Sequence, residues 1–165
     1  MGAGLATALH DDRADDFERS GCFPDEVVSC ERQVPQWWTE AIQRIGMLMD
    51  LSDNWDSYGA KAPNVSIAHC AVDILQEIAL PGIPQPAIVP TPRGNIQFEW
   101  HEQGIDLELE VLSQAKISVS FEDSETGAEW DVELDYNLTP LSDSLKLLIN
   151  RRMLINQAIG NTLNA

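Results

Sequence analysis

The stretch GIDLELEV, residues 104–111, alternates aliphatic and acidic side chains without interruption. Successive side chains of a β-strand point to opposite faces of the sheet. On a strand, the aliphatic face comprises Ile105, Leu107, Leu109 and Val111, and the acidic face comprises Asp106, Glu108 and Glu110. The aliphatic face requires a hydrophobic core, and the acidic face raises the question of what a row of carboxylates contacts.

The same period of two extends to both sides of this stretch. Apolar and polar residues alternate from Ile96 onward, and turns are expected at Gln103-Gly104, Ser113-Gln114 and residues 122–129. These turns divide residues 95–135 into four strands. Consecutive strands with short connections form an antiparallel meander, with one face buried and one exposed to water.

Apolar residues recur at helical spacing before and after the predicted sheet, which predicts helices near residues 36–50, 65–79 and 141–158. Asn64 or Ser66 is expected to cap the second helix. The large aromatic residues of the alternating segment have to be buried by these helices, namely Phe98, Trp100, Phe121 and Trp130.

The remaining segments complete the predicted organisation. Five prolines within residues 81–92 exclude a helix and predict an extended crossover. Residues 1–34 are rich in aspartate and glutamate and poor in large apolar side chains, which predicts a separate, mobile, acidic N-terminal arm. We therefore predict one α+β domain over residues 35–165, of order α-α-β-β-β-β-α, in which helices cover one face of a four-stranded antiparallel meander.

The 165-residue chain contains 27 acidic and 10 basic residues, which gives a net charge of −17. Such a charge repels nucleic acids and anionic membranes and attracts basic surfaces. The three cysteines form no CxxC motif, which indicates reduced thiols. No apolar stretch approaches the roughly 18 residues of a membrane span. These features predict a cytoplasmic protein.

The negative charge is concentrated in the predicted sheet. Residues 95–135 contain twelve acidic residues and one basic residue, Lys116. The exposed face is expected to carry no lysine or arginine and eight carboxylates: Glu99, Asp106, Glu108, Glu110, Glu122, Asp131, Glu133 and Asp135. Like charges on neighbouring strands are destabilising, by up to about 1 kcal/mol per opposed pair. This cost favours a partner-binding face, and the alternative is a face that is merely solvated.

The segment SDNWDSYGA, residues 52–60, is the most distinctive loop of the chain. We expect it to be structural, with Trp55 and Tyr58 buried against the first two helices and with Asp56 accepting hydrogen bonds from backbone amides. Asn54 suits a turn, and Gly59 permits a positive φ. A divalent-metal enzyme that uses Asp53, Asp56 or the sheet carboxylates is a further, less favoured interpretation.

Two motifs resemble a family of small bacterial proteins. The segments are NWDSYGA (54–60) and PAIVPTPRGNIQFEW (86–100), followed by the alternating strand IDLELEV (105–111). The family pattern runs WDGYGA, a helix, P-x-x-x-P-T-P-x-G-x-I-x-x-E-W and an alternating strand, and Ser57 stands where glycine is commoner. The similarity covers about residues 45–112. It implies a bacterial source and one shared domain, and it implies no activity.

Catalytic motifs are absent from the sequence, which contains no HExxH, GxSxG, P-loop or GxGxxG pattern and no Cys/His quartet. We therefore expect no enzymatic activity, no cofactor and no metal. The sequence favours a non-catalytic module that binds a basic protein, namely a nucleic-acid enzyme or complex, as an inhibitor, antitoxin, immunity-type protein or anti-CRISPR-like DNA mimic. The alternative is an accessory or adaptor subunit of a larger bacterial complex that binds through apolar helix surfaces.

Overall fold

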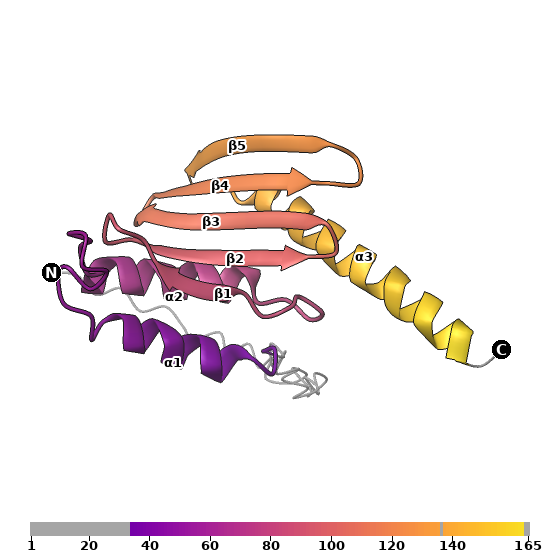
Figure 1. The fold of residues 1–165 in the computed structure, drawn as a ribbon, viewed down its shortest axis with the longest axis horizontal. Coiled ribbons are helices and arrows are strands. Elements are labelled where there is room, and N and C mark those ends of the chain that lie inside the picture. Colours follow the sequence, from indigo (N-terminus) through magenta and orange to yellow (C-terminus); the bar gives the residue numbers. More distant parts are fainter. Residues whose placement is uncertain (1–33, 136, 164–165) are drawn as a thin grey trace, which may run out of the picture. The chain divides into compact units, whose positions relative to one another are not determined.

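The computed structural model describes residues 34–135 and 137–163. Apart from Val34, the predicted N-terminal arm lies outside the described residues. Three helices and one five-stranded antiparallel sheet make up this part of the chain (Figure 1), which confirms the predicted α+β class. In chain order the elements are α1 (Trp38–Leu48), α2 (Val65–Ile78), β1 (Ala87–Pro90), β2 (Ile96–Glu102), β3 (Ile105–Ser113), β4 (Lys116–Asp123), β5 (Ala128–Asp135) and α3 (Thr139–Leu163).

The prediction of four strands is wrong, because β1 adds a fifth. It pairs antiparallel with β2 in a sheet of order β1-β2-β3-β4-β5, with Ile88 opposite Phe98. Proline is tolerated in an edge strand because its missing N–H would face away from the ladder. The buried Ile88 side chain anchors β1 to the core, and the Ile88 carbonyl accepts a 2.9 Å hydrogen bond from Nε of Arg44 in α1.

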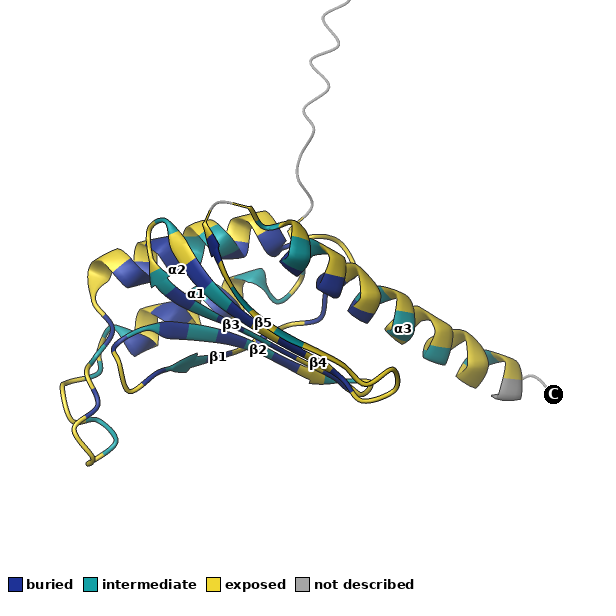
Figure 2. Cartoon of the chain, turned by 90° about the horizontal axis from the view of Figure 1, so that it is seen from above, coloured by how far each residue is buried: buried dark blue, intermediate teal, exposed yellow. Residues whose placement is uncertain are grey.

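The predicted aliphatic face of the meander is buried. Figure 1 shows the strands in front of α2 and of the first turns of α3. Buried positions alternate with less buried ones along β2, β3 and β4, as the colours of Figure 2 show. Phe98, Leu107, Leu109 and Val119 are completely buried. Trp130 is only half-buried and stacks on Phe121 with ring centroids 5.3 Å apart, so its predicted full burial is wrong at this edge strand.

The proline-rich segment between α2 and β1 is fastened by two tryptophans. Nε1 of Trp100 donates a 2.9 Å hydrogen bond to the carbonyl of Pro84, and Nε1 of Trp37 donates one of the same length to the carbonyl of Ile83. Backbone carbonyls of this segment, which belongs to no helix or strand, therefore still have hydrogen-bond partners. The predicted turn at Gln103-Gly104 is confirmed, with φ values of 56° and 75° that suit a two-residue hairpin loop.

The helices follow the prediction closely at their beginnings. The Asn64 side chain caps α2 by accepting hydrogen bonds from the amides of Ser66 and Ile67. α3 is longer than expected and ends at Leu163, so Arg151 and Arg152 lie near its middle. Within the described ranges, no helix combines the length and apolarity needed to cross a bilayer.

Candidate functional site

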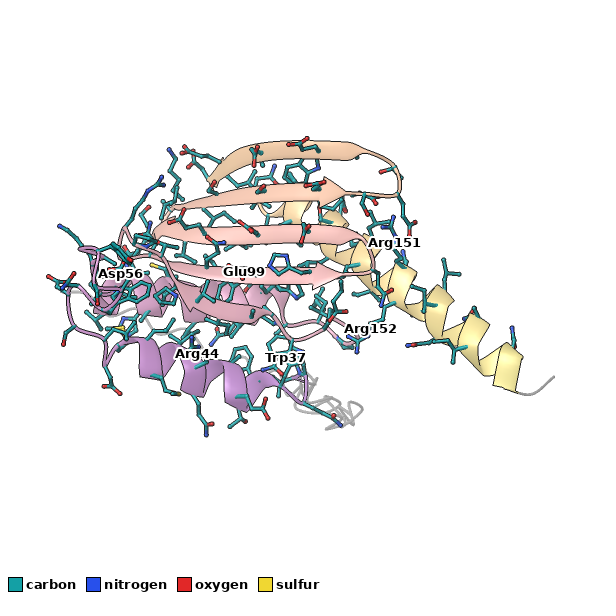
Figure 3. All side chains as sticks on the ribbon, in the orientation of Figure 1. Trp37, Arg44, Asp56, Glu99, Arg151 and Arg152 are labelled. Carbon is teal, nitrogen blue, oxygen red and sulfur yellow. The ribbon has the colours of Figure 1, made fainter. Side chains whose placement is uncertain are left out.

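The solvent-exposed face of the sheet holds all eight predicted carboxylates. Strand registers align seven of them in three rows across the sheet: Gln97–Glu110–Ser118–Glu133, Glu99–Glu108–Ser120–Asp131 and His101–Asp106–Glu122–Glu129. The eighth, Asp135, lies opposite Lys116. Glu129, which the sequence analysis omitted, belongs to the same face because it precedes Asp131 by two residues on β5. We call these nine carboxylates the acidic face. Figure 3 shows the sheet from this side, with Glu99 near its centre.

Lys116 also lies on this face, which corrects the expectation that the face contains no lysine. β4 begins at Lys116, and the period of two places this residue on the same side as Ser118. Its ammonium group forms an ion pair with Glu133 and lies opposite Asp135 in the strand register. The hydrogen bond to Glu133 raises the pKa of Lys116. One corner of the acidic face is therefore partly neutralised.

The carboxylates of β2 and β3 are bound by neighbouring side chains. Glu99 and Glu108 lie directly opposite each other, and the Gln97 amide nitrogen donates a 3.0 Å hydrogen bond to each of them. Because one amide N–H group points to each carboxylate, this donor reduces the repulsion between the two charges. This pair is stabilised within the protein itself.

Glu110 on β3 has three neighbouring side chains that can donate a hydrogen bond to its carboxylate. The Thr91 hydroxyl and the Asn95 amide donate to Oε1 at 3.0 and 2.9 Å, and the Arg93 guanidinium lies 3.8 Å from Oε2. Thr91 and Asn95 belong to the turn that joins β1 to β2, where the Thr91 amide also donates to the Asn95 carbonyl. The Glu110 carboxylate therefore fastens this turn to the sheet.

His101 lies at the end of β2 between two carboxylates. Its Nδ1 is hydrogen-bonded to Asp106, and its Nε2 lies 3.4 Å from Oε2 of Glu99. The hydrogen bond to Asp106 is the main reason that the pKa of His101 is raised. Glu99, His101 and Glu108 place one ligand atom each within 4.8 Å of one another, so these three groups could hold a divalent metal. The Gln97 amide already occupies the space between the two glutamates.

We expect the pKa of His101 to exceed its ordinary value of about 6.5 and to fall in an Asp106→Asn variant. A raised pKa in the folded state stabilises the protein below the unfolded-state value, and this contribution is lost as the pH rises through the folded-state pKa. NMR titration of the imidazole protons measures the shift. Asp131→Asn, which removes the same charge without contacting His101, is the matched control. Equal pKa changes in both variants would exclude a specific Asp106–His101 interaction.

Three acids of β4 and β5 differ from those of β2 and β3. Glu122, Glu129 and Asp131 are exposed and form no hydrogen bond or ion pair with any other described side chain. In the strand register, Glu122 lies between Asp106 on one side and Glu129 on the other. We call Glu122, Glu129 and Asp131 the unpaired acidic patch. It is the part of the acidic face whose charges are free to meet an external cation.

The loop at residues 52–60 is held by hydrogen bonds and not by the packing of its aromatic rings. Tyr58 is 94% exposed, and Trp55 is only half-buried, so the prediction that both are buried against the first two helices is wrong. Instead, Nε1 of Trp55 donates a 3.1 Å hydrogen bond to the Lys61 carbonyl. Hydrogen bonds within the loop hold it closed, so its conformation does not depend on burial of the two aromatic rings.

Side-chain to backbone hydrogen bonds fix the loop, as predicted for Asp56. Its carboxylate accepts from the amides of Tyr58 and Ala60 at 2.8 and 3.0 Å, and the bond from Tyr58 is the main cause of its lowered pKa. The Asn54 side chain accepts from Gly59, which has a φ of 95°. Asp53 accepts from the amide of Ala62. These acids serve the loop backbone, which disfavours the metal-enzyme interpretation for Asp53 and Asp56.

One buried ion pair was not foreseen from the sequence. Asp123, which is 1% exposed, accepts 2.8 and 2.9 Å hydrogen bonds from the two terminal nitrogens of Arg151 in α3. Arg151 also donates to the Gln103 carbonyl in the β2–β3 turn. One arginine thus connects both hairpin turns at this end of the sheet to α3. The pKa of Asp123 is held far below its usual range, chiefly by the hydrogen bonds from Arg151.

The chain was compared with protein-family models, with curated proteins and with solved structures, and none of the three comparisons gave a match. The resemblance of the Trp55 loop and the following strands to a family of small bacterial proteins therefore stays a prediction.

Proposed function

We propose that the protein is a non-catalytic, cytoplasmic binding module whose acidic face docks on a basic surface of a nucleic-acid-binding protein and inhibits or neutralises that protein. The observation that carries this proposal is the unpaired acidic patch. The carboxylates of Glu122, Glu129 and Asp131 repel one another, and they form no hydrogen bond or ion pair with any described residue. The repulsion between these carboxylates is relieved when a basic partner docks.

The spacing of the carboxylates supports mimicry of a nucleic acid. Neighbouring strands lie about 4.8 Å apart, and residues two apart on one strand are separated by nearly 7 Å. The row Asp106–Glu122–Glu129 crosses three strands, and Asp131 lies next to it along β5. A surface that binds the dense negative charge of a phosphate backbone meets a comparable charge density here. The proposed role is therefore that of an inhibitor, antitoxin or immunity-type protein that acts as a DNA mimic.

An adaptor function is a second candidate, and the apolar surface of α3 favours it. Met153, Leu154 and Ile159 are 55%, 66% and 54% exposed in the second half of this helix. An adaptor that binds through these residues would bury apolar side chains and would respond little to salt. The two candidate functions therefore differ in the surface that binds the partner and in how strongly added salt weakens that binding.

The proposal is tested by immobilising the full chain, capturing partners from a lysate of the source organism and eluting them with rising salt. We expect the main partner to be a basic nucleic-acid-binding protein, with an apparent affinity that falls at least tenfold between 50 and about 300 mM salt. A duplex oligonucleotide should compete for the same partner, because both ligands would occupy one basic site. Capture that is indifferent to salt and to the oligonucleotide would contradict the proposal and favour an adaptor.

A further inference from the structure

The apolar stripe of α3 continues beyond the sheet that it covers. Leu141, Leu145 and Leu148 are 0%, 2% and 0% exposed, whereas Ile155 is half-buried and Ile159 is 54% exposed. All five lie on one line of the helix, at spacings of three, four and seven residues. Figure 1 shows that the C-terminal half of α3 extends past the ends of the strands, and Figure 2 shows the same helix changing from buried to exposed colours.

A helix in this position needs apolar contacts. α3 contains 25 residues, so it is about 37 Å long, and the twelve residues from Arg152 onward account for about 18 Å of that length. Isolated helical segments of this length are marginal in water, and Gly160 and the β-branched Ile155 and Ile159 do not raise helix propensity. The stripe of the half-buried Ile155 and the 54% exposed Ile159 supplies the surface for such contacts.

The charge of this segment indicates what can pack against it. Residues 147–163 contain no aspartate or glutamate, although the chain as a whole carries a net charge of −17. The two arginines of the segment have acidic neighbours of their own, Arg151 with Asp123 and Arg152 with Glu102 at 3.8 Å. Two acidic faces repel each other. The acid-free end of α3 can meet its own copy without that repulsion, and it offers no carboxylates to a basic partner.

We propose that the C-terminal half of α3 packs antiparallel against the same segment of a second copy and forms a homodimer. Ile155 and Ile159 of each copy make the apolar contact. In an antiparallel pair, Arg152 of each copy lies beside the last turn of the other helix, where the negative end of the helix dipole favours a cation. A twofold pair of identical surfaces is the commonest form of association between copies.

The structure also predicts how salt affects this dimer. The contact lies beyond the ends of the strands, so it does not include the acidic face of either copy, and physiological salt screens charges that are more than about 8 Å apart. Added salt screens the remaining repulsion and leaves the apolar contact intact. Self-association should therefore be unchanged or tighter at high salt, whereas binding of a basic partner to the acidic face should weaken.

Sedimentation velocity of the full chain over about 1–500 μM tests the proposal. The interface is small, so we expect a dissociation constant in the roughly micromolar range and a mass that rises from 18.3 kDa toward twice that value. The Ile155→Glu and Ile159→Glu double variant should weaken self-association at least about 30-fold. Asn150→Glu with Gln157→Glu adds the same charge to the opposite face of the helix and should change it less than about threefold.

Circular dichroism of each variant separates loss of the dimer from loss of the fold, and the milder Ile159→Asn variant repeats the test without adding charge. A wild-type chain that stays at 18.3 kDa throughout the concentration range would overturn the proposal. Equal weakening by both glutamate pairs would overturn it as well, because it would show general repulsion and no specific stripe. A dimer that weakens as salt rises would overturn it too, because it would show that attraction between opposite charges, and not the apolar stripe, holds the copies together.

Discussion

Lysine substitution of both Glu122 and Asp131 is expected to slow association with the basic partner by about 10- to 100-fold, while the fold stays at least as stable as in the wild type. Both side chains are exposed and form no interaction with another described side chain. They can therefore be replaced without loss of a native contact. Reversal of two central charges replaces attraction to the partner by repulsion.

The stability part of this expectation follows from the strand register. Glu122 faces Asp106 and Glu129, so a lysine at position 122 converts two like-charge neighbours into opposite-charge pairs. Each exposed pair of this kind contributes about 0.2–1 kcal/mol. The free energy of unfolding, measured by urea denaturation, should therefore stay unchanged or rise slightly. A variant that binds more slowly and is no less stable identifies charges that serve binding and not folding.

The matched control is Asp73→Lys with Glu77→Lys in α2, on the side of the sheet opposite the acidic face. Both pairs of substitutions change the net charge of −17 by the same amount. Stopped-flow association at low and at high salt compares them. The control should slow association by less than about threefold. Equal slowing by the two pairs would mean that overall charge, and not the acidic face, attracts the partner.

Arg151→Met is expected to lower the melting temperature by roughly 5–10 °C. The substitution keeps most of the aliphatic bulk of the side chain but leaves the buried Asp123 carboxylate without its cation. It also removes the hydrogen bond to the Gln103 carbonyl, which joins the β2–β3 turn to α3. Thermal unfolding at pH 7, followed by circular dichroism, measures the loss.

The neighbouring Arg152 supplies the control, because it is 45% exposed and lies 3.8 Å from Glu102. Arg152→Met should shift the melting temperature by less than about 2 °C. Addition of Asp123→Asn to Arg151→Met should recover part of the loss, since no buried charge then lacks a partner. Similar melting temperatures for Arg151→Met and Arg152→Met would show that the buried pair is not a determinant of stability.

The pH dependence of the wild type follows from the same pair. Arg151 holds the pKa of Asp123 below its unfolded value, so the pair stabilises the protein at neutral pH. This contribution declines as the pH falls below about 4, where the unfolded carboxyl begins to take up a proton. The difference in melting temperature between wild type and Arg151→Met should therefore be smaller at pH 3 than at pH 7.

The strands that the sequence predicted correctly are those with an unbroken period of two. Alternation from Ile96 to Asp135 placed four strands and their faces, and the eight predicted carboxylates all lie on the exposed side. Both omissions from that face, Lys116 and Glu129, lie at strand ends. Alternation was not extended to them because turn residues stand next to each. β1 was missed because four residues ending in Pro90 are too few to show a period.

The loop around Trp55 shows a different kind of failure. Asp56 was correctly predicted to bind backbone amides, since short acidic side chains in turns do so locally. Burial of Trp55 and Tyr58 was predicted from hydrophobicity alone. Whether an aromatic ring in a loop meets a core depends on the path of the chain around it, and here Tyr58 points away from the rest of the domain into solvent.

The sequence by itself determined the α+β class and the position of a highly acidic sheet face, because side-chain alternation is a local property of a strand. The tertiary structure alone decided which acids on that face are unpaired. Gln97 and His101 bind acids across the strand register, and the loop residues Thr91 and Asn95 reach Glu110, whereas nothing described reaches Glu122, Glu129 and Asp131. The tertiary structure also decided that Arg151 contacts Asp123, 28 residues away along the chain. Contacts between distant segments depend on how the helices and strands pack. Neither the alternation of side chains nor the composition of the chain shows which distant residues will meet.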